Sequence, residues 1–150
     1  MAMDHRADRR ATACSLLAAV LLATTACSGG IAGTLGQSAK DASSAVGSVA
    51  LALRLESSGR ATDALAQATA EDMVDEAASA YKSAASQSPA NSAELSRQQQ
   101  VLQVLGRALD SLQAARLAQQ SGDNAARNAA AEDLERQAGE LSRLSREFKP

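Results

Sequence analysis

Residues 91–122 read NSAELSRQQQVLQVLGRALDSLQAARLAQQSG. Apolar side chains recur in this stretch at intervals of three, four or seven residues, which is the spacing of one face of an α-helix. This apolar stripe comprises Leu95, Val101, Leu102, Val104, Leu105, Ala108, Leu109 and Leu112. Such a stripe is typical of a helix that buries one side in a protein core. The stretch therefore predicts an α-helical fold.

Both ends of this predicted helix carry end signals. Asn91, with Glu94 three residues later, resembles a capping box, in which both side chains bind backbone N–H groups at the helix start. Gly122 follows the last apolar turn, and glycine readily adopts the left-handed conformation that ends a helix. We therefore expect this helix to lie between Asn91 and Gly122.

A last helix is predicted from Asp123 or Asn124, either of which is a suitable N-cap, to about Phe148. Its expected core face comprises Ala130, Leu134, Ala138, Leu141, Leu144 and Phe148. Leu134, Leu141 and Phe148 are seven residues apart, but the repeat covers fewer heptads than a coiled coil needs. The pattern favours packing within one chain.

Residues 39–57 predict another helix, which Gly59 ends. Its expected core face comprises Ala42, Ala45, Val46, Val49 and Leu53. Apolar residues also alternate from Val49 to Leu55, so a strand is an alternative for that segment. The surrounding alanines favour the helix, because alanine has the highest helix propensity.

Between these elements, Thr62 is a good N-cap for a helix that must stop by Ser88, because Pro89 disfavours helical geometry in the residue before it. Its expected core face comprises Leu65, Thr69, Met73, Ala77, Ala80, Tyr81 and Ala84. The four helices are joined by short turns, which suggests antiparallel neighbours. We therefore expect residues 39–150 to form a small, Ala-rich, all-α antiparallel bundle of three to four helices. The last two helices carry most of the large side chains and should form its stable hairpin.

The N-terminal segment carries a different signal. Arg6, Arg9 and Arg10 precede an uncharged stretch, residues 11–26, which reads ATACSLLAAVLLATTA. A basic start, a short apolar run and small residues before a cut are the features of an export signal.

The end of this stretch resembles the lipobox of bacterial lipoprotein signal peptides. Ala26 stands directly before Cys27, as the small residue before the modified cysteine does in that family, and Thr25 fits beside it. Thr24 departs from the pattern, which usually has leucine there. The resemblance implies that residues 1–26 are a signal peptide, that the chain is cut between Ala26 and Cys27, and that Cys27 is acylated. It implies an exported protein anchored by lipid on the outer side of the cell membrane.

Two other interpretations of the same segment stay open. A conventional cleaved signal would use the same small residues and release a soluble protein. An uncleaved membrane helix needs about 20 apolar residues, and residues 11–26 are fewer. In a bacterium with two membranes, Ser28 after the cysteine would permit sorting to the outer membrane.

Residues 27–38 begin with Cys27 and continue as SGGIAGTLGQS, a composition typical of a flexible tether. A phosphate-binding loop is the alternative for this glycine-rich run, but the Gly-Lys-Ser/Thr ending of such loops is missing. We therefore divide the chain into a signal peptide at 1–26, a lipidated cysteine with tether at 27–38, and a helical domain at 39–150.

Composition argues against several functions. The net charge is −2, without the basic surface that nucleic acid binding requires. The only cysteines are Cys14 and Cys27 and the only histidine is His5, so a chain starting at Cys27 would contain no histidine and no free thiol. The carboxylates Glu71, Asp72, Asp75 and Glu76 could attract a cation, but they fit a solvated helix face or an acidic patch that faces a partner better than a metal site. We expect no catalytic residues, no metal and no cofactor.

These observations predict a membrane-anchored lipoprotein with a non-catalytic helical domain. Its partners would be the membrane, through the lipid on Cys27, and an envelope protein that the bundle binds or supports. The alternative is a carrier that holds a small apolar ligand or a lipid between its helices. An enclosed apolar cavity would favour the carrier, and an exposed apolar groove on a filled bundle would favour the interaction module.

Overall fold

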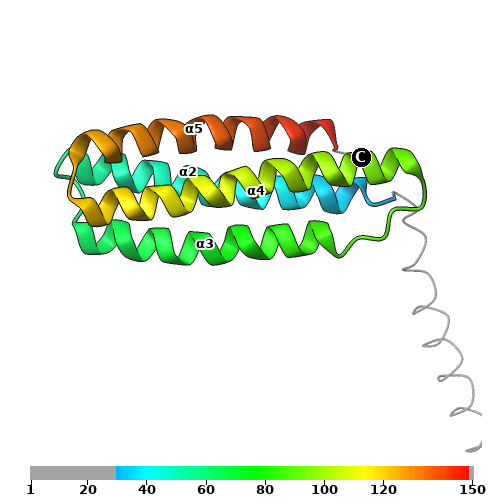
Figure 1. The fold of residues 1–150 in the computed structure, drawn as a ribbon, viewed down its shortest axis with the longest axis horizontal. Helices are drawn as coiled ribbons and strands as arrows, with labels where there is room; N and C mark the ends of the chain where they lie inside the picture. The colour runs from blue at the N-terminus through cyan, green and yellow to red at the C-terminus, as the bar shows by residue number, and fades with distance from the viewer. Residues whose placement is uncertain (1–29, 149–150) are drawn as a thin grey trace, which may run out of the picture.

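The computed structural model describes residues 30–148. They form four α-helices: α2 (Ala32–Ser57), α3 (Asp63–Ala85), α4 (Ser92–Ser121) and α5 (Asn124–Glu147). Successive helices run in opposite directions along one long axis (Figure 1). Within residues 30–148 there is no strand, so the strand alternative for Val49 to Leu55 is wrong. The predicted all-α antiparallel bundle is confirmed.

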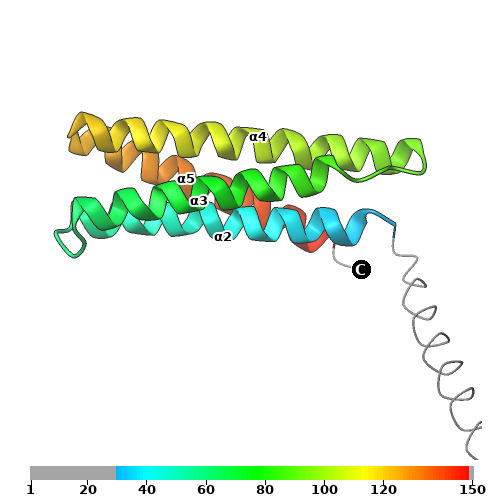
Figure 2. The ribbon, with the colours of Figure 1, turned by 90° about the horizontal axis from the view of Figure 1, so that it is seen from below.

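Helix α2 is the central element of the bundle. It contacts α3 and α5 along its length and α4 across the core, whereas α3 and α5 occupy opposite corners. Figure 2, seen from below, shows α3 and α2 beside each other with α4 on the far side of α3. Both α2 and α4 contact all the other described helices, but the two most extensive contacts are those of α2 with α5 and with α3.

That α4 and α5 form the stable hairpin stays a prediction; they pack against each other, but the most extensive contact among the described helices joins α2 to α5. Small side chains explain the difference, since the distance between two helices is set by the residues at their contact. A Cβ atom added to Gly47 would lie 4.0 Å from the Cβ of Ala138. The hydroxyl of Ser43 donates to the Ala138 carbonyl oxygen at 2.9 Å, across the same contact.

Leucine and valine side chains from α2, α4 and α5 fill the core. Its largest fully buried members are Leu35, Val46, Val49, Leu53, Val101, Leu105, Leu112, Leu134, Leu141 and Leu144. Helix α3 contributes small side chains instead, namely Ala66, Ala70, Ala77, Ala80 and Ala84. All residues predicted for the core face of the helix at 39–57 are buried, and so are Leu134, Leu141, Leu144 and Phe148 of the last helix.

Two leucines predicted to be in the core are on the surface. Leu65 is 59% exposed and Leu95 is 43% exposed. Helix α3 turns Ala66 and Ala70 towards the core, which moves Leu65 to the side of the helix. Leu95 lies in the first turn of α4, which extends beyond the end of α3 (Figure 1). Helical spacing predicts a face, but tertiary packing turned Leu65 away from the core and left Leu95 beyond the end of α3.

The predicted starts of α3, α4 and α5 are confirmed by side-chain caps. Thr62 Oγ1 accepts from the backbone N–H of Leu65 at 3.3 Å, and Asn91 Oδ1 accepts from that of Glu94 at 2.9 Å. Glu94 Oε2 in turn accepts from the backbone N–H of Ala90 at 2.8 Å, one residue before the N-cap that a capping box would use. Asp123 caps α5 through the N–H of Ala125.

The tether predicted for residues 27–38 is wrong from residue 32 onwards, because α2 begins at Ala32. Its glycines, Gly33 and Gly36, lower helix propensity by about 1 kcal/mol each relative to alanine. Tertiary packing offsets this cost, since Ile31, Leu35 and Ala39 continue the buried stripe of α2 towards its start. Gly36 also lets the end of α5 approach closely. Local composition predicts a loop for residues 32–38, but burial of their apolar side chains stabilises a helix there.

Candidate interaction surface

The residues that sequence singled out for lipidation and cleavage, Ala26 and Cys27, lie outside the described residues, as does the whole predicted signal peptide at 1–26. The acidic residues of α3, Glu71, Asp72, Asp75 and Glu76, are all exposed. Across residues 30–148, no group of three or more acidic, histidine or cysteine side chains is arranged to hold a metal ion. The candidate sites that can be described are therefore surfaces and grooves.

A buried ion pair joins α2 to α5 at the end of the bundle where α2 finishes. The Arg127 guanidinium donates to Glu56 Oε1, and Gln119 Nε2 of α4 donates to Glu56 Oε2 at 3.4 Å. The side chains of Glu56 and Arg127 are only 6% and 15% exposed. Removing one partner of such a pair leaves a buried charge, which typically costs about 3–5 kcal/mol. We infer that this cluster has a structural role and stabilises the packing of α2, α4 and α5 against one another.

A second pair between the same two helices is exposed to solvent. Arg54 donates to both carboxylate oxygens of Glu135, at 3.0 and 3.2 Å. These hydrogen bonds hold the pKa of the Glu135 carboxyl below its ordinary value and raise the pKa of Arg54. The pair lies on the outer surface and is not part of any hollow described below.

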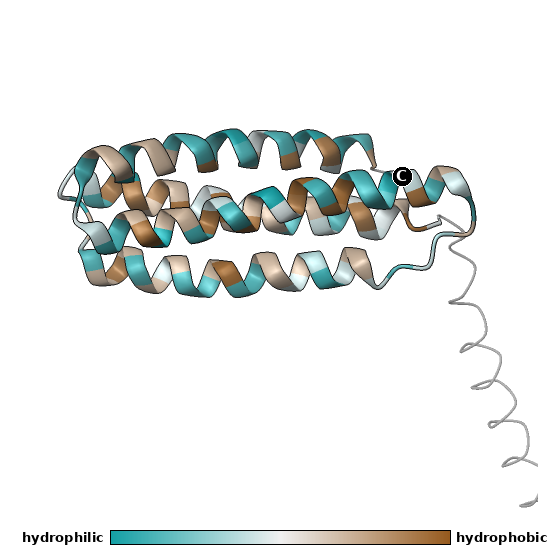
Figure 3. Ribbon diagram, in the orientation of Figure 1, coloured by the Kyte–Doolittle hydropathy of each residue, from teal (hydrophilic) through white to brown (hydrophobic). Residues whose placement is uncertain are grey.

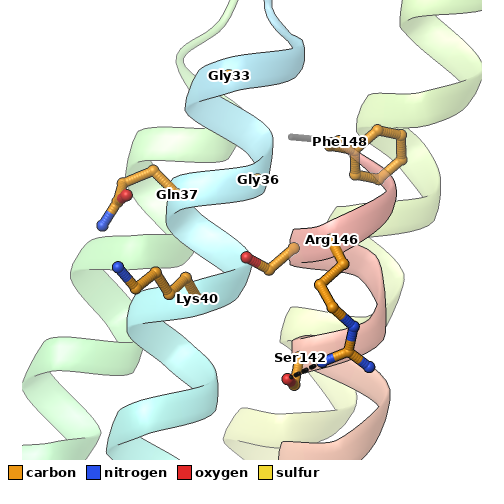
Figure 4. A pocket seen from close by; sticks show the side chains of 8 residues that line it. Gly33, Gly36, Gln37, Lys40, Ser142, Arg146 and Phe148 are labelled. Carbon is orange, nitrogen blue, oxygen red and sulfur yellow. Dashed lines mark hydrogen bonds between the residues drawn. The ribbon is translucent and has the colours of Figure 1, made fainter. Parts of the chain in front are cut away.

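A polar groove of about 370 Å³ lies between the start of α2 and the end of α5. Figure 4 shows Gln37 and Lys40 on its α2 side and Ser142 and Arg146 on its α5 side. Arg146 donates to Ser142 Oγ at 2.7 Å, which turns its guanidinium along α5. Phe148 lies at one end of this groove. The groove is open to solvent and lined mainly by polar side chains.

Two further hollows lie in line between α2 and α3. The one near the start of α2 measures about 430 Å³ and is lined chiefly by Thr34, Gln37, Asp41, Glu76, Ser79 and Ser83. The other measures about 210 Å³ and is lined by Ser48, Leu51, Ala52, Leu55, Ala61, Leu65 and Thr69. Residues 34, 41, 48 and 55 are seven apart and therefore share one side of α2. We call the surface that contains both hollows the α2–α3 groove.

One end of the α2–α3 groove is apolar. Leu51 of α2 and Leu65 of α3 are each 59% exposed and line the same hollow. Leu53, two residues from Leu51, is fully buried in the core. Residues 49–55 of α2 read VALALRL, so this part of the helix is apolar on nearly all sides. A helix with apolar residues all round is normally covered all round, whereas here the side bearing Leu51 is bare.

The middle and the other end of the α2–α3 groove are acidic. Asp41 and Glu76 line the larger hollow, and helical spacing puts Asp72 beside Glu76, one turn towards Leu65. Among the described residues that line the two hollows there is no lysine or arginine. Gln37 donates to Asp41 Oδ1 at 2.7 Å. The groove therefore combines exposed leucines with uncompensated negative charge.

Helices α2 to α5 include none that is both long enough and apolar enough to cross a membrane. Comparisons with protein-family models, with curated proteins and with solved structures gave no match for this chain. The hydropathy of the residues distinguishes the helices from one another. In Figure 3, α5 is coloured mainly as hydrophilic along its outward side, in contrast to the apolar run of α2.

The sequence did not predict the α2–α3 groove, because its two exposed leucines give different sequence signals. Leu65 fitted the stripe predicted for the core, so it gave no sign of exposure. Leu51 lies outside the predicted core face of residues 39–57, and this was the available signal. A bulky apolar residue opposite the buried stripe of a helix indicates a second contact surface.

Proposed function

We propose that this protein is a membrane-anchored bacterial lipoprotein whose non-catalytic helical bundle binds or supports another protein of the cell envelope. The anchor is inferred from Arg6, Arg9 and Arg10, the uncharged residues 11–26 and the small residue Ala26 before Cys27. The proposed mature chain begins at Cys27, carries lipid on that residue, and lies on the outer side of the membrane.

The start of α2 bears on how the bundle would sit relative to the anchor. Ile31, the N-cap of α2, is four residues after Cys27. A fully extended chain spans at most about 3.3–3.6 Å per residue, so Ile31 would lie within about 14 Å of the lipidated residue. The end of the bundle that contains the start of α2 and the end of α5 would then face the lipid headgroups. The apolar end of the α2–α3 groove, near Leu51 and Leu65, would be the end farther from the membrane.

The observation that favours an interaction module over a carrier is where the apolar surface lies. The core is filled by leucine, valine and alanine side chains, and the hollows described above are open grooves on the outside of the bundle. A carrier of apolar ligands would enclose its cargo in an apolar cavity. Exposed leucines that line an open groove are instead typical of a protein-binding surface.

Lipid labelling tests the anchor. Cells that produce the full chain are grown with a clickable fatty acid, and the purified protein is examined by in-gel fluorescence and intact mass. We expect labelling of the unmodified chain and of the Cys14→Ala variant, because Cys14 lies inside the proposed signal. The Cys27→Ala variant should carry no label and should keep residues 1–26. Label that persists in Cys27→Ala, or an unmodified Cys27 in the native product, would contradict the proposal.

Lipid transfer tests the carrier alternative. The full chain is mixed with donor vesicles containing fluorescent phospholipid, and transfer to acceptor vesicles is measured. An interaction module should give the rate of the protein-free control. Transfer that rises in proportion to protein concentration would favour the carrier.

A further inference from the structure

We propose that the α2–α3 groove binds a basic amphipathic α-helix from a partner protein. The apolar residues of that helix would lie over Leu51, Leu55 and Leu65. Its lysine or arginine side chains would lie beside Asp72 and Glu76. This inference deepens the interaction role proposed above and rests on it, but it does not depend on the lipid anchor.

The shape of the groove fits a helix. It lies between two antiparallel helices, and from Thr34 to Leu55 of α2 it extends for about 30 Å at 1.5 Å per residue. A third helix laid along it would contact α2 and α3 together, as in helix-in-groove recognition. Asp72 and Glu76 follow Leu65 by seven and eleven residues on α3, or about 10 to 17 Å. The partner helix therefore needs its apolar and basic segments separated by about two to three turns.

The apolar contacts come from leucines that gather on one surface. Single exposed apolar residues are common on soluble proteins and need no explanation. Leu117, which is 66% exposed on the outer side of α4, is such a case, since it lines none of the hollows described here. Leu51, Leu55 and Leu65 instead line one hollow from two helices. A leucine or a similar side chain of a partner would bury all three together.

Charge decides which partner fits. The side chains of the groove that carry charge are Asp41 and Glu76, with Asp72 next to them, so a basic segment is attracted along its length. A second copy of this chain fits poorly, because a symmetric dimer places the same surface on both subunits. The carboxylates of one copy would then meet a surface with the same negative charge. Anionic lipid is disfavoured for the same reason.

A binding measurement tests the groove directly. The full chain is purified, reconstituted into neutral phosphatidylcholine vesicles and titrated against a fluorescent helical peptide that carries leucines in one segment and lysines two to three turns away, on the same face. Fluorescence anisotropy gives the Kd, and empty vesicles give the background. An otherwise identical peptide with glutamate in place of lysine reports the contribution of charge. We expect the lysine peptide to bind and the glutamate peptide to stay at background.

Matched variants locate the binding site. The double change Asp72→Lys with Glu76→Lys should weaken peptide binding about tenfold or more, since two attractive contacts become repulsive. Asp110→Lys with Glu132→Lys alters the net charge equally at exposed carboxylates of α4 and α5, and should leave the Kd within about twofold. In the same way, Leu51→Ser with Leu65→Ser should weaken binding, and Leu117→Ser should not.

The proposal is overturned if the two charge variants weaken binding equally, or if neither does. It is also overturned if a photo-crosslinker at position 51 joins two copies of this chain, which would make a second copy the occupant. The intact mass of the same preparation reports on Cys27 independently. A missing lipid with intact peptide binding would refute the anchor alone, whereas a lipidated chain without groove binding would refute this inference alone.

Discussion

Helix α2 has two flanks that differ in how completely the neighbouring helices cover them. On the flank towards α5, small residues such as Gly36 and Gly47 allow close approach, and Ser43 and Arg54 bind α5 side chains or backbone. On the flank towards the α2–α3 groove, α3 offers alanines to the core and leaves Leu51 of α2 in contact with solvent. We call the flank towards α5 the closed flank, because α5 covers it except at the polar groove near the start of α2, and we call the other the open flank, because it leaves Leu51 exposed.

The difference shows which apolar side chains of an alanine-rich bundle are buried and which stay exposed. Alanine buries little area, so α3 packs on α2 without covering the larger side chains beside the contact. Each apolar side chain left uncovered forgoes the stabilisation that burial would give, about 25 cal/mol per Å². The closed flank therefore supports stability, and the open flank is the surface available for recognition. The predictions below compare the two.

The largest expected effect separates Leu53 from Leu51, which lie two residues apart on α2. Leu53→Ala should lower the free energy of unfolding by about 2–5 kcal/mol, because it opens a cavity in the core. Leu51→Ala should change it by no more than about 0.5 kcal/mol, since that side chain is mostly in solvent. Urea unfolding followed by circular dichroism measures both values. Equal losses of unfolding free energy in the two variants would show that Leu51 is buried in the unbound protein. That result would contradict the open flank.

The fold was largely predictable from the sequence. The helix of residues 91–122 combines a long apolar stripe with two end signals, and both Asn91 and Gly122 mark its ends in the structure. Capping is local chemistry, so single residues such as Thr62 and Asp123 specify it. The start of α2 was not predictable from composition, because Gly33 and Gly36 favour a loop locally. Their helical conformation depends on packing against residues more than a hundred positions away.

The candidate surface was much less predictable. Helical spacing identifies a stripe but not which neighbour covers its edges, so it put Leu65 in the core. The rotation of α3 follows from its alanines, which let Ala66 and Ala70 approach α2 while Leu65 turns outward. That is a tertiary effect of side-chain size. The acidic residues of α3 were correctly predicted to be solvated, but their position beside exposed leucines required the packed structure.

A smaller effect is expected at the two glycines near the start of α2. A Cβ atom at Gly33, beside the open groove, would meet nothing within 4 Å, whereas one at Gly36 would lie 3.2 Å from the carbonyl oxygen of Phe148. Gly33→Ala should therefore raise the unfolding free energy by about 0.4–1 kcal/mol, through reduced chain entropy in the unfolded state. Gly36→Ala should lose that gain, because the end of α5 must move.

Thermal unfolding of the two glycine variants also tests where α2 begins. If residues 32–38 were a flexible tether, neither substitution would change the melting temperature, and the two variants would be alike. A higher melting temperature for Gly33→Ala than for Gly36→Ala requires that both positions are helical and that only Gly36 is in close contact with the end of α5.

The smallest effect concerns the exposed pair of Arg54 and Glu135 on the closed flank. Hydrogen bonds from Arg54 lower the pKa of the Glu135 carboxyl in the folded state. A group with a lowered folded pKa adds stability above its unfolded pKa, near 4.3 for glutamate, and that stability is lost as pH falls through the folded pKa. Glu135→Gln should therefore lower the melting temperature slightly at pH 7, and the difference should vanish on acidification.

A matched control for this pair is Glu132→Gln, which removes an exposed carboxylate one turn earlier on α5. It should show a weaker pH dependence, because in the described structure Arg54 bonds to Glu135 rather than to Glu132. A Glu135→Gln deficit that persisted or grew at a pH well below the ordinary pKa of glutamate, where the carboxylate is protonated in the folded and the unfolded state, would mean that the carboxylate is not held by Arg54 in solution. The closed flank of α2 would then depend on packing, the Ser43 hydrogen bond and the buried Glu56–Arg127 pair, and the exposed pair would add nothing to the contrast between the two flanks.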